Sequence, residues 1–301
     1  DVYTRIYKAD GSAQTAELLV NTTVADWQWL PQVAALSSGG LVVTWGGAGQ
    51  DGSGYGVFAQ RLDANGGLIG GEFRLNTTTS GNQGGTIDVF GGHVHLASSA
   101  RLDASGELGG GSVHLGGGWQ GSGNQRNADT TTVDDAALIN VRAMQSGNGG
   151  EAVVWADGHT RFRGTIDARA GDSGGDGGRV EVSGKQTLDF GGLVDASALH
   201  GVGGFLLLDP ATMTVGLAEA GLINRVLRLG VSTAIAADVD INVNSAIDGR
   251  GRLAGGGLSM TAGNNINLND YVITNEGALT LTASAGTINI AAGKGAFTGS
   301  A

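Results

Sequence analysis

Four aspartates recur in one short phrase, in which an apolar residue precedes the aspartate and a small residue follows it: Asp103, Asp167, Asp195 and Asp248. Carboxylates stacked at about 5 Å in successive repeats would raise one another's pKa or bind Ca²⁺, which prefers oxygen ligands. Alternatively, each aspartate caps its own turn by accepting hydrogen bonds from backbone N–H groups. We expect the turns, and Asp103, Asp167, Asp195 and Asp248 are the candidate ligands if Ca²⁺ is a cofactor.

Histidines form a second candidate cluster. His93 and His95 alternate with Val94 and Leu96, so the imidazoles should share the outward face of one strand. We expect His114 one repeat further on, beside His95. Such a group could bind a transition metal or sense acid, but the sequence offers no third ligand. Stacking on the surface is therefore the expected role.

Tryptophans gather near the N-terminus. Trp27 and Trp29 lie two residues apart, hence on one face of a strand, and Trp45 follows in the next strand. Exposed tryptophan is a good platform for sugar rings and a good anchor for a protein partner, whereas buried tryptophan fills a core. Trp27, Trp29 and Trp45 are the candidate ligand-binding residues, with surface glycans as the candidate ligand.

Charged residues near the middle of the chain raise the question of catalysis. Asp157, Asp167, Arg161, Arg163 and Lys185 could converge on one face, as carboxylates and a basic side chain do in polysaccharide-active enzymes. They fit solvated outward positions equally well. The chain has no phosphate-binding Gly-x-x-x-x-Gly-Lys loop and no His-Glu-x-x-His motif. We therefore expect a protein that is not an enzyme, with a polysaccharide-binding or polysaccharide-active protein as the alternative.

Short alternating strands separate these residues and return every ~20–30 residues with glycine at the corners, which is typical of a solenoid. Ile166 and Val194 are 28 residues apart, and Val153 and Val180 are 27 apart. Val94 and Val113 would mark a shorter repeat of 19 residues. A coil of three short strands with turns needs about that many residues at ~3.3 Å each. The polar stretch 119–150 should add an extra coil or loop.

Composition agrees with an elongated β fold. Of 301 residues, 57 are glycine, 41% are hydrophobic and only 5% are aromatic, so a thin core of small side chains is favoured over a thick globular one. The formal net charge of −11 argues against nucleic acid or an anionic membrane as partner. We find no apolar stretch of about 20 residues and therefore expect no membrane insertion.

Two segments depart from the solenoid pattern. Residues 217–229 place Leu222, Ile223, Val226 and Leu229 at helical spacing, and Gly230 follows, which predicts a short amphipathic helix. Residues 1–83 instead contain a 55-residue repeat. Its Ala-Asp-Gly turn at 9–11 returns as Ala-Asn-Gly at 64–66, and the Glu-x-x-x-Asn-Thr-Thr text of 17–23 returns at 72–78. About four short strands a repeat predict a small antiparallel module like a propeller blade.

The text PQVAALSSGGLVVTW, GQDGSGYGVFAQRLDANG and GGEFRLNTTTSGNQ in this N-terminal module resembles repeats of large bacterial surface and calcium-dependent exoproteins. Residues 84–295 resemble the filamentous haemagglutinin-like exoproteins of two-partner secretion. The phrases that carry this resemblance are GGHVHLASSARLDASGELGGGSVHL, GGEAVVWADGHTRFRGTIDARAG, GGDGGRVEVSGKQTLDFGGLVDASA and GFLLLDPATMTVG.

The resemblance implies a right-handed parallel β-helix that is secreted or attached to the bacterial cell surface as an adhesin or fibre. The expected fold is therefore all-β, with a blade-like module over residues 1–83 and a parallel β-helix over 84–301. The expected function is a β-solenoid shaft for adhesion, biofilm matrix or fibre assembly. The expected partners are further copies of the chain or the remaining parts of a larger exoprotein, because the chain looks like a mature product or an excised segment.

Overall fold

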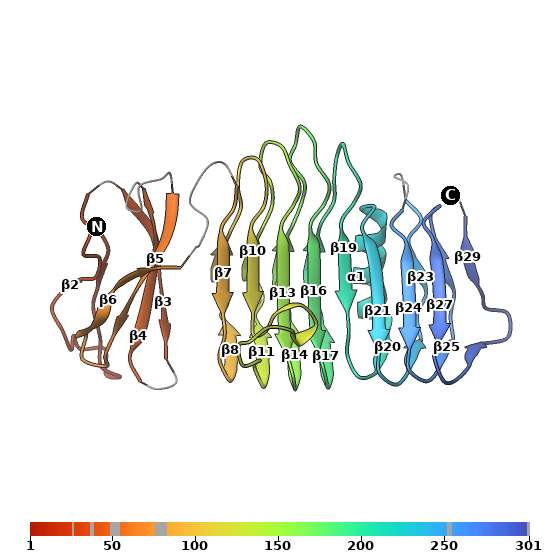
Figure 1. The fold of residues 1–301 in the computed structure, drawn as a ribbon. Helices are drawn as coiled ribbons and strands as arrows, with labels where there is room; N and C mark the ends of the chain where they lie inside the picture. Colours follow the sequence, from red (N-terminus) through yellow and green to blue (C-terminus); the bar gives the residue numbers. More distant parts are fainter. Residues whose placement is uncertain (26, 37–38, 49–54, 76–82, 252–254, 300–301) are drawn as a thin grey trace. The chain divides into compact units, whose positions relative to one another are not determined.

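The computed structural model describes residues 1–25, 27–36, 39–48, 55–75, 83–251 and 255–299, and the chain forms two compact units, 1–81 and 82–301. The sequence placed the boundary at 83/84. The predicted fold class is confirmed: all-β, with stacked parallel strands in the larger unit, one α-helix and a small antiparallel sheet in the N-terminal unit (Figure 1).

The N-terminal unit is a short hairpin packed on a sheet. β1 (Tyr3–Thr4) and β2 (Leu18–Leu19) form the hairpin, and β3 (Gln28–Ala35), β4 (Leu41–Ala48), β5 (Tyr55–Leu62) and β6 (Leu68–Arg74) form a sheet in chain order. All these pairings are antiparallel. Period-2 alternation in β4 buries Val43 and Trp45 on one face of the sheet, and Val2 and Val20 from the hairpin segment cover them.

The larger unit is a three-faced solenoid in which every strand pairs in parallel with the strand one coil away. The first face is one eight-stranded sheet: β7 (Thr86–Val89), β10 (Ser112–Leu115), β13 (Glu151–Ala156), β16 (Arg179–Gly184), β19 (Phe205–Leu208), β21 (Ser232–Ala237), β24 (Leu258–Ala262) and β27 (Leu279–Ala283). The interior is apolar along the whole stack, from Ile87 to Leu279.

The second and third faces are each divided into two sheets. The second face contains β8 (His93–Leu96), β11 (Thr130–Val133), β14 (His159–Phe162) and β17 (Thr187–Phe190), then β20 (Met213–Val215), β22 (Ile241–Val243), β25 (Ile266–Leu268) and β28 (Ile288–Ile290). The third face contains β9 (Arg101–Asp103), β12 (Leu138–Asn140), β15 (Thr165–Asp167) and β18 (Leu193–Asp195), then β23 (Ile247–Asp248), β26 (Val272–Thr274) and β29 (Ala296–Thr298).

The predicted helix is confirmed as α1 (Leu217–Arg228), and it follows β20 at the place in the coil where the other coils carry a third-face strand. It buries Ala220, Ile223, Val226 and Leu227 and contacts β18 on one side and β23 on the other. The Glu219 carboxylate accepts the Gly216 N–H at 3.1 Å and so caps the first turn. Because α1 replaces one strand, the third-face ladder is interrupted between β18 and β23.

The predicted strand registers were partly wrong. Val113 pairs with Ile87 and Ala152 on the first face, whereas Val94 pairs with Thr131 on the second, so the 19-residue spacing joined two different faces. Similarly, Val180 pairs with Ala152 and not with Val153, while the pairing of Ile166 with Val194 is confirmed. The stretch from 119 contains a 3-10 turn, η1 (Trp119–Gly121), in a long loop before β11, as well as the strands of the same coil.

Glycine closes the corner before the first face. The residue immediately before each of the first five strands of this face is a glycine: Gly85, Gly111, Gly150, Gly178 and Gly204. A Cβ atom at Gly178 would lie 2.2 Å from the carbonyl oxygen of Gly150 in the preceding coil, and one at Gly150 would lie 1.9 Å from that of Gly111. Successive coils therefore approach too closely here for any side chain.

Candidate functional sites

The four recurring aspartates form the predicted turns. The Asp103 carboxylate accepts the Ser105 N–H at 3.0 Å, and the Asp195 carboxylate accepts the Ser197 N–H at 3.0 Å. In the same way Asp167 accepts the Arg169 N–H and Asp248 accepts the Arg250 N–H. Each aspartate thus fixes the corner that follows its own third-face strand.

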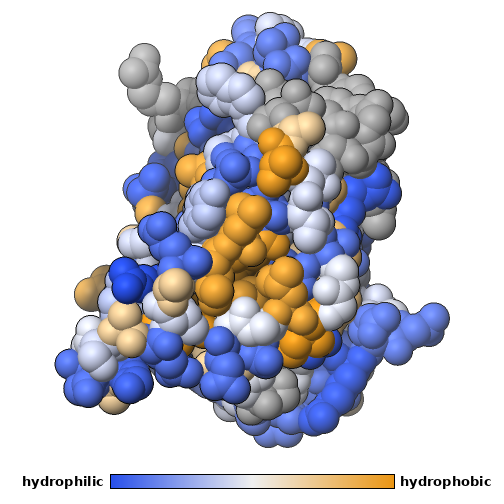
Figure 2. Space-filling model, turned by 90° about the vertical axis from the view of Figure 1, so that its left-hand side faces the viewer, coloured by the Kyte–Doolittle hydropathy of each residue, from blue (hydrophilic) through white to orange (hydrophobic). Residues whose placement is uncertain are grey.

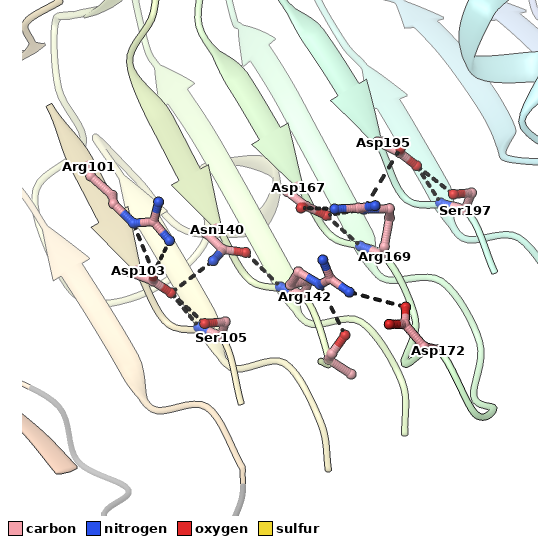
Figure 3. Close-up of polar contacts among 11 residues, drawn as sticks. Arg101, Asp103, Ser105, Asn140, Arg142, Asp167, Arg169, Asp172, Asp195 and Ser197 are labelled. Atoms are coloured by element: carbon pink, nitrogen blue, oxygen red, sulfur yellow. Dashed lines mark hydrogen bonds and ion pairs between the residues drawn. The ribbon is translucent and has the colours of Figure 1, made fainter. Parts of the chain in front are cut away.

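Three of these aspartates share a ladder on the third face (Figure 3). The order across the coils is Asp103, Asn140, Asp167, Asp195, so an amide separates the first carboxylate from the second. Asn140 donates to Asp103 at 3.0 Å, and Arg169 lies 2.7 Å from Asp167 and 3.9 Å from Asp195. Asp248 does not belong to this ladder, because α1 separates β18 from β23.

Hydrogen-bond donors surround these carboxylates. Burial alone would raise the pKa of Asp103, but hydrogen bonds from Ser105 and Arg101 outweigh it and hold the pKa below its ordinary value. In the described ranges, no group of three or more histidines, aspartates or glutamates is arranged to hold a metal ion. The oxygens that Ca²⁺ would need already accept hydrogen bonds from serine and arginine.

The expected pairing of His114 with His95 was wrong. His95 lies on the second face, where its neighbour in the next coil is Thr132, and its ring is 2.7 Å from Asp134. His93 contacts Thr130 at 2.8 Å. His114 lies on the first face instead, so the structure does not bring the histidines together. The error has the same origin as the wrong pairing of Val94 with Val113.

His114 links three coils of the first face. Its Nδ1 lies 2.7 Å from Asp88 and its Nε2 lies 3.0 Å from Glu151. The hydrogen bond with Glu151 is the largest effect that raises the pKa of His114, and the same bond lowers the pKa of Glu151. When the imidazole is protonated, both nitrogens donate, one to each carboxylate. Sequence analysis did not predict these contacts, because the partners of His114 are 26 and 37 residues away in the chain.

The three N-terminal tryptophans have different environments. Trp27 is 81% exposed, whereas Trp45 is 1% exposed in the core of the sheet beside Phe58. Trp29 packs flat against Gly46 on the opposite face from Trp45, since a Cβ at Gly46 would lie 2.8 Å from its ring. Trp45 therefore fills the core, which was the alternative interpretation, and Trp27 is the tryptophan best placed to meet a ligand.

Asp157 and Lys185, which the sequence suggested for catalysis, do meet in a pocket of about 410 Å³. The loop that follows β10, visible in Figure 1 in front of β13 and β16, forms one wall of it. The lining residues are Gln120, Gly121, Asn127, Trp155, Asp157, Lys185, Asp209 and Asp238. Asp157 is held by two donors, Trp155 Nε1 at 3.0 Å and Asn127 Nδ2 at 3.1 Å.

The other three residues of that prediction lie elsewhere. Arg161 and Arg163 lie on the second face, where Arg163 makes an ion pair with Asp189 at 2.7 Å. Asp167 lies in the third-face ladder. Period-2 alternation and the three-faced coil send these side chains in different directions, so the predicted convergence was wrong for Asp167, Arg161 and Arg163.

Glu181 is buried beneath the same loop and was missed. One carboxylate oxygen accepts the Gln120 N–H at 2.7 Å, and the other, Oε1, has no hydrogen-bond partner in the described part of the chain. Burial raises its pKa to about 7. Burial also raises the pKa of Asp209, whose carboxylate is 3.5 Å from Gln120 Nε2. A carboxyl group that is half protonated near neutral pH can give or take a proton.

Neither models of known protein families nor curated proteins match this chain. Among the described residues, no helix is long and apolar enough to cross a membrane.

Proposed function

We propose that this chain is a structural and adhesive segment of a bacterial exoprotein that is secreted or held at the cell surface, with the solenoid as its shaft. The observation that carries the proposal is the eight-stranded first face, which runs through the whole unit without interruption over one continuous apolar core. The resemblance of residues 84–295 to filamentous haemagglutinin-like exoproteins supports the same function.

The stack is suited to carrying load along its axis. Every coil pairs with the next through backbone hydrogen bonds on the first face, and most coils also pair on the second and third faces. The eight first-face strands span about 35 Å at ~4.8 Å a coil. Side-chain ladders add polar links between coils, such as Asn242 to Asn267 at 2.8 Å and Asn267 to Asn289 at 2.7 Å. A solenoid of this kind is lengthened simply by adding coils.

Display of the chain on bacteria that lack other adhesins tests the function. We expect displaying cells to attach to host-cell and abiotic surfaces more than cells that carry the display anchor alone. Electron microscopy of the purified chain, with and without Ca²⁺, should show rods or filaments that do not depend on the ion. Attachment no greater than that of the anchor control would overturn the adhesive role, and particles without a rod would overturn the shaft.

A second candidate function is the binding or cleavage of a polysaccharide in the pocket beside the long loop, which is lined by several carboxylates and one lysine. The observation that favours it is the meeting of Lys185 and Asp157 with the buried Glu181 close by. Screening against a panel of bacterial and host polysaccharides, for binding and for new reducing ends, tests it. Activity should disappear in Lys185→Met and Asp157→Asn but persist in Asp172→Asn, whose carboxylate is 79% exposed on another corner.

A further inference from the structure

The β1–β2 hairpin is repeated, 55 residues later, by β5–β6. Tyr3 pairs with Leu19 and Thr4 with Leu18 in the hairpin. The residues at the same positions of the repeat, Phe58 with Arg74 and Ala59 with Phe73, pair in the same way. The bridge between Tyr7 and Ala13 recurs as the pair of Leu62 and Leu68. The hairpin is therefore the second half of a four-stranded repeat of which β3–β6 are a complete copy.

The turns and hairpin ends repeat as well. The Lys8 N–H donates to Ser12 at 2.8 Å, as the Asp63 N–H donates to Gly67 at 2.8 Å. At the open end of the hairpin, the Val20 N–H donates to Val2, and the Leu75 N–H donates to Val57. Equivalence across 55 residues thus holds for backbone hydrogen bonds and not only for the sequence text.

The structure shows how one copy of the repeat packs on the next. The hairpin places Val2 and Val20 on the inner face of the β3–β6 sheet, which we define by its buried residues Val43, Trp45, Phe58 and Leu62. A carboxylate oxygen of Glu72 accepts the Thr22 N–H at 2.7 Å and its hydroxyl at 3.0 Å, which fixes the chain after the hairpin to the edge of the sheet. The contact is face to face between successive repeats.

The opposite face of the same sheet carries the equivalents of the hairpin's packing residues. Val57 and Leu75 occupy the positions of Val2 and Val20, and Phe73 occupies that of Leu18. We call this surface the open face. Phe73 is 41% exposed on it and Ile69, paired with Arg61 beside Ala59, is 40% exposed. Figure 2 shows that exposed apolar side chains form a band between hydrophilic ones on one side of the N-terminal unit.

The hairpin's outer surface is the complement of the open face. Tyr3 and Tyr7 stand at the positions of Phe58 and Leu62, which are 4% and 0% exposed because a hairpin covers them. Tyr3 and Tyr7 themselves are 56% and 58% exposed. The N-terminal unit therefore exposes two matching surfaces. The open face corresponds to the side of the hairpin that packs on a sheet, and the outer surface of the hairpin corresponds to the side of a sheet on which a hairpin packs. Apolar side chains that are exposed together on one surface often mark an interaction site.

We infer that the open face of the β3–β6 sheet docks on the outer surface of the β1–β2 hairpin of a second copy of this chain. The contact would reproduce, between two molecules, the face-to-face packing that the hairpin and sheet make within one. It is heterologous, so it joins copies head to tail into open chains or closed rings. The association rests on the N-terminal unit alone and does not depend on the shaft function.

Sedimentation velocity of the full chain over a range of micromolar concentrations tests this. The wild-type chain should associate, and Phe73→Asp on the open face or Tyr3→Asp on the hairpin should each raise the dissociation constant about tenfold or more. Leu199→Asp, at an apolar residue 76% exposed in the larger unit, should change nothing. Circular dichroism and thermal unfolding of each variant show whether it keeps its fold.

Mixing the two variants distinguishes a head-to-tail contact from a symmetric one. The Tyr3→Asp copy keeps its open face and the Phe73→Asp copy keeps its hairpin surface, so an equimolar mixture should form dimers and no longer assemblies. A wild-type chain that stays monomeric would overturn the inference. So would association that Leu199→Asp weakens equally, or a mixture that remains monomeric while the wild type associates.

Discussion

The two halves of the solenoid, before and after α1, link the stacked polar residues of successive coils with different side chains. In a parallel stack, equivalent residues of successive coils lie about 4.8 Å apart, so a polar residue meets its own counterpart. Before α1, the third-face ladder runs Asp103, Asn140, Asp167, Asp195 with arginines beside the carboxylates. After α1, the second-face ladder is all asparagine: Asn242, Asn267 and Asn289.

The difference follows from what each side chain can do for a copy of itself. A carboxylate only accepts hydrogen bonds, so stacked carboxylates need a cation or an amide between them. An asparagine both donates and accepts, so identical residues can bond in series without any other partner. The first half therefore carries titratable, charged links between coils, whereas the ladder in the second half is neutral.

The largest expected effect concerns the corner glycines of the first half. In Gly178→Ala the new Cβ would lie 2.2 Å from the carbonyl oxygen of Gly150, so the coils must move apart. We expect a loss of about 3 kcal/mol in the free energy of unfolding, measured by denaturant titration. The matched variant in the second half is Gly257→Ala, in which the new Cβ would lie 3.2 Å from its nearest neighbour, the carbonyl oxygen of Ala278. Equal losses in the two variants would contradict the close approach of coils before α1.

The second prediction concerns the buried Glu181. Its folded pKa of about 7 lies above the ordinary value of 4.5, so folding favours the protonated form. The contribution of the protonated group to the free energy of unfolding is complete below pH 4.5 and is lost as the pH rises through 7. The total loss is up to about 3 kcal/mol. Glu181→Gln still accepts the Gln120 N–H but never ionises. The variant should match the wild type at pH 4 and unfold at a higher denaturant concentration at pH 8; equal midpoints at pH 8 would show that the carboxylate is solvated.

How much of this could be predicted from the sequence depended on whether a contact was local. The helix was found because Ile223 and Val226 follow helical spacing and Gly230 ends it, and the aspartate turns because donor and acceptor are two residues apart. The partners of His114 and the loop that covers Glu181 could not be predicted. The contact of His114 with Glu151 and the cover over Glu181 depend on the long loop before β11, which changes the spacing between coils and so hides the register.

The third prediction reverses the chemistry of the neutral ladder. In the wild type, Asn267 Nδ2 donates to Asn242 Oδ1 at 2.8 Å. In Asn267→Asp this oxygen faces a carboxylate, which cannot donate. We expect a loss of about 1–2 kcal/mol at pH 7, and less below pH 4 where the carboxyl group can donate again. Asp167→Asn is the control in the charged ladder, because an amide already occupies the neighbouring position at Asn140. It should cost no more than about 1 kcal/mol, as expected for a partly exposed ion pair; a reversed order would contradict the contrast between the two ladders.

The smallest expected effect tests whether the charged half alone responds to mild pH change. The pKa of His114 is raised, first by the hydrogen bond with Glu151 and then by Asp88, so its stabilisation is complete below pH 6.5 and is lost as the pH rises through the folded pKa. His114→Gln should therefore cost about 1 kcal/mol near pH 6 and less at pH 9. Amide hydrogen exchange, measured by mass spectrometry for each peptide, should be faster in β7, β10 and β13 of the variant and unchanged in β24 and β27. The control, His95→Gln, alters a ring that is 59% exposed, so its contact with Asp134 is largely screened by solvent. If the peptides of β24 and β27 also exchange faster in His114→Gln, the two halves unfold as one unit and the charged links of the first half stabilise the whole stack.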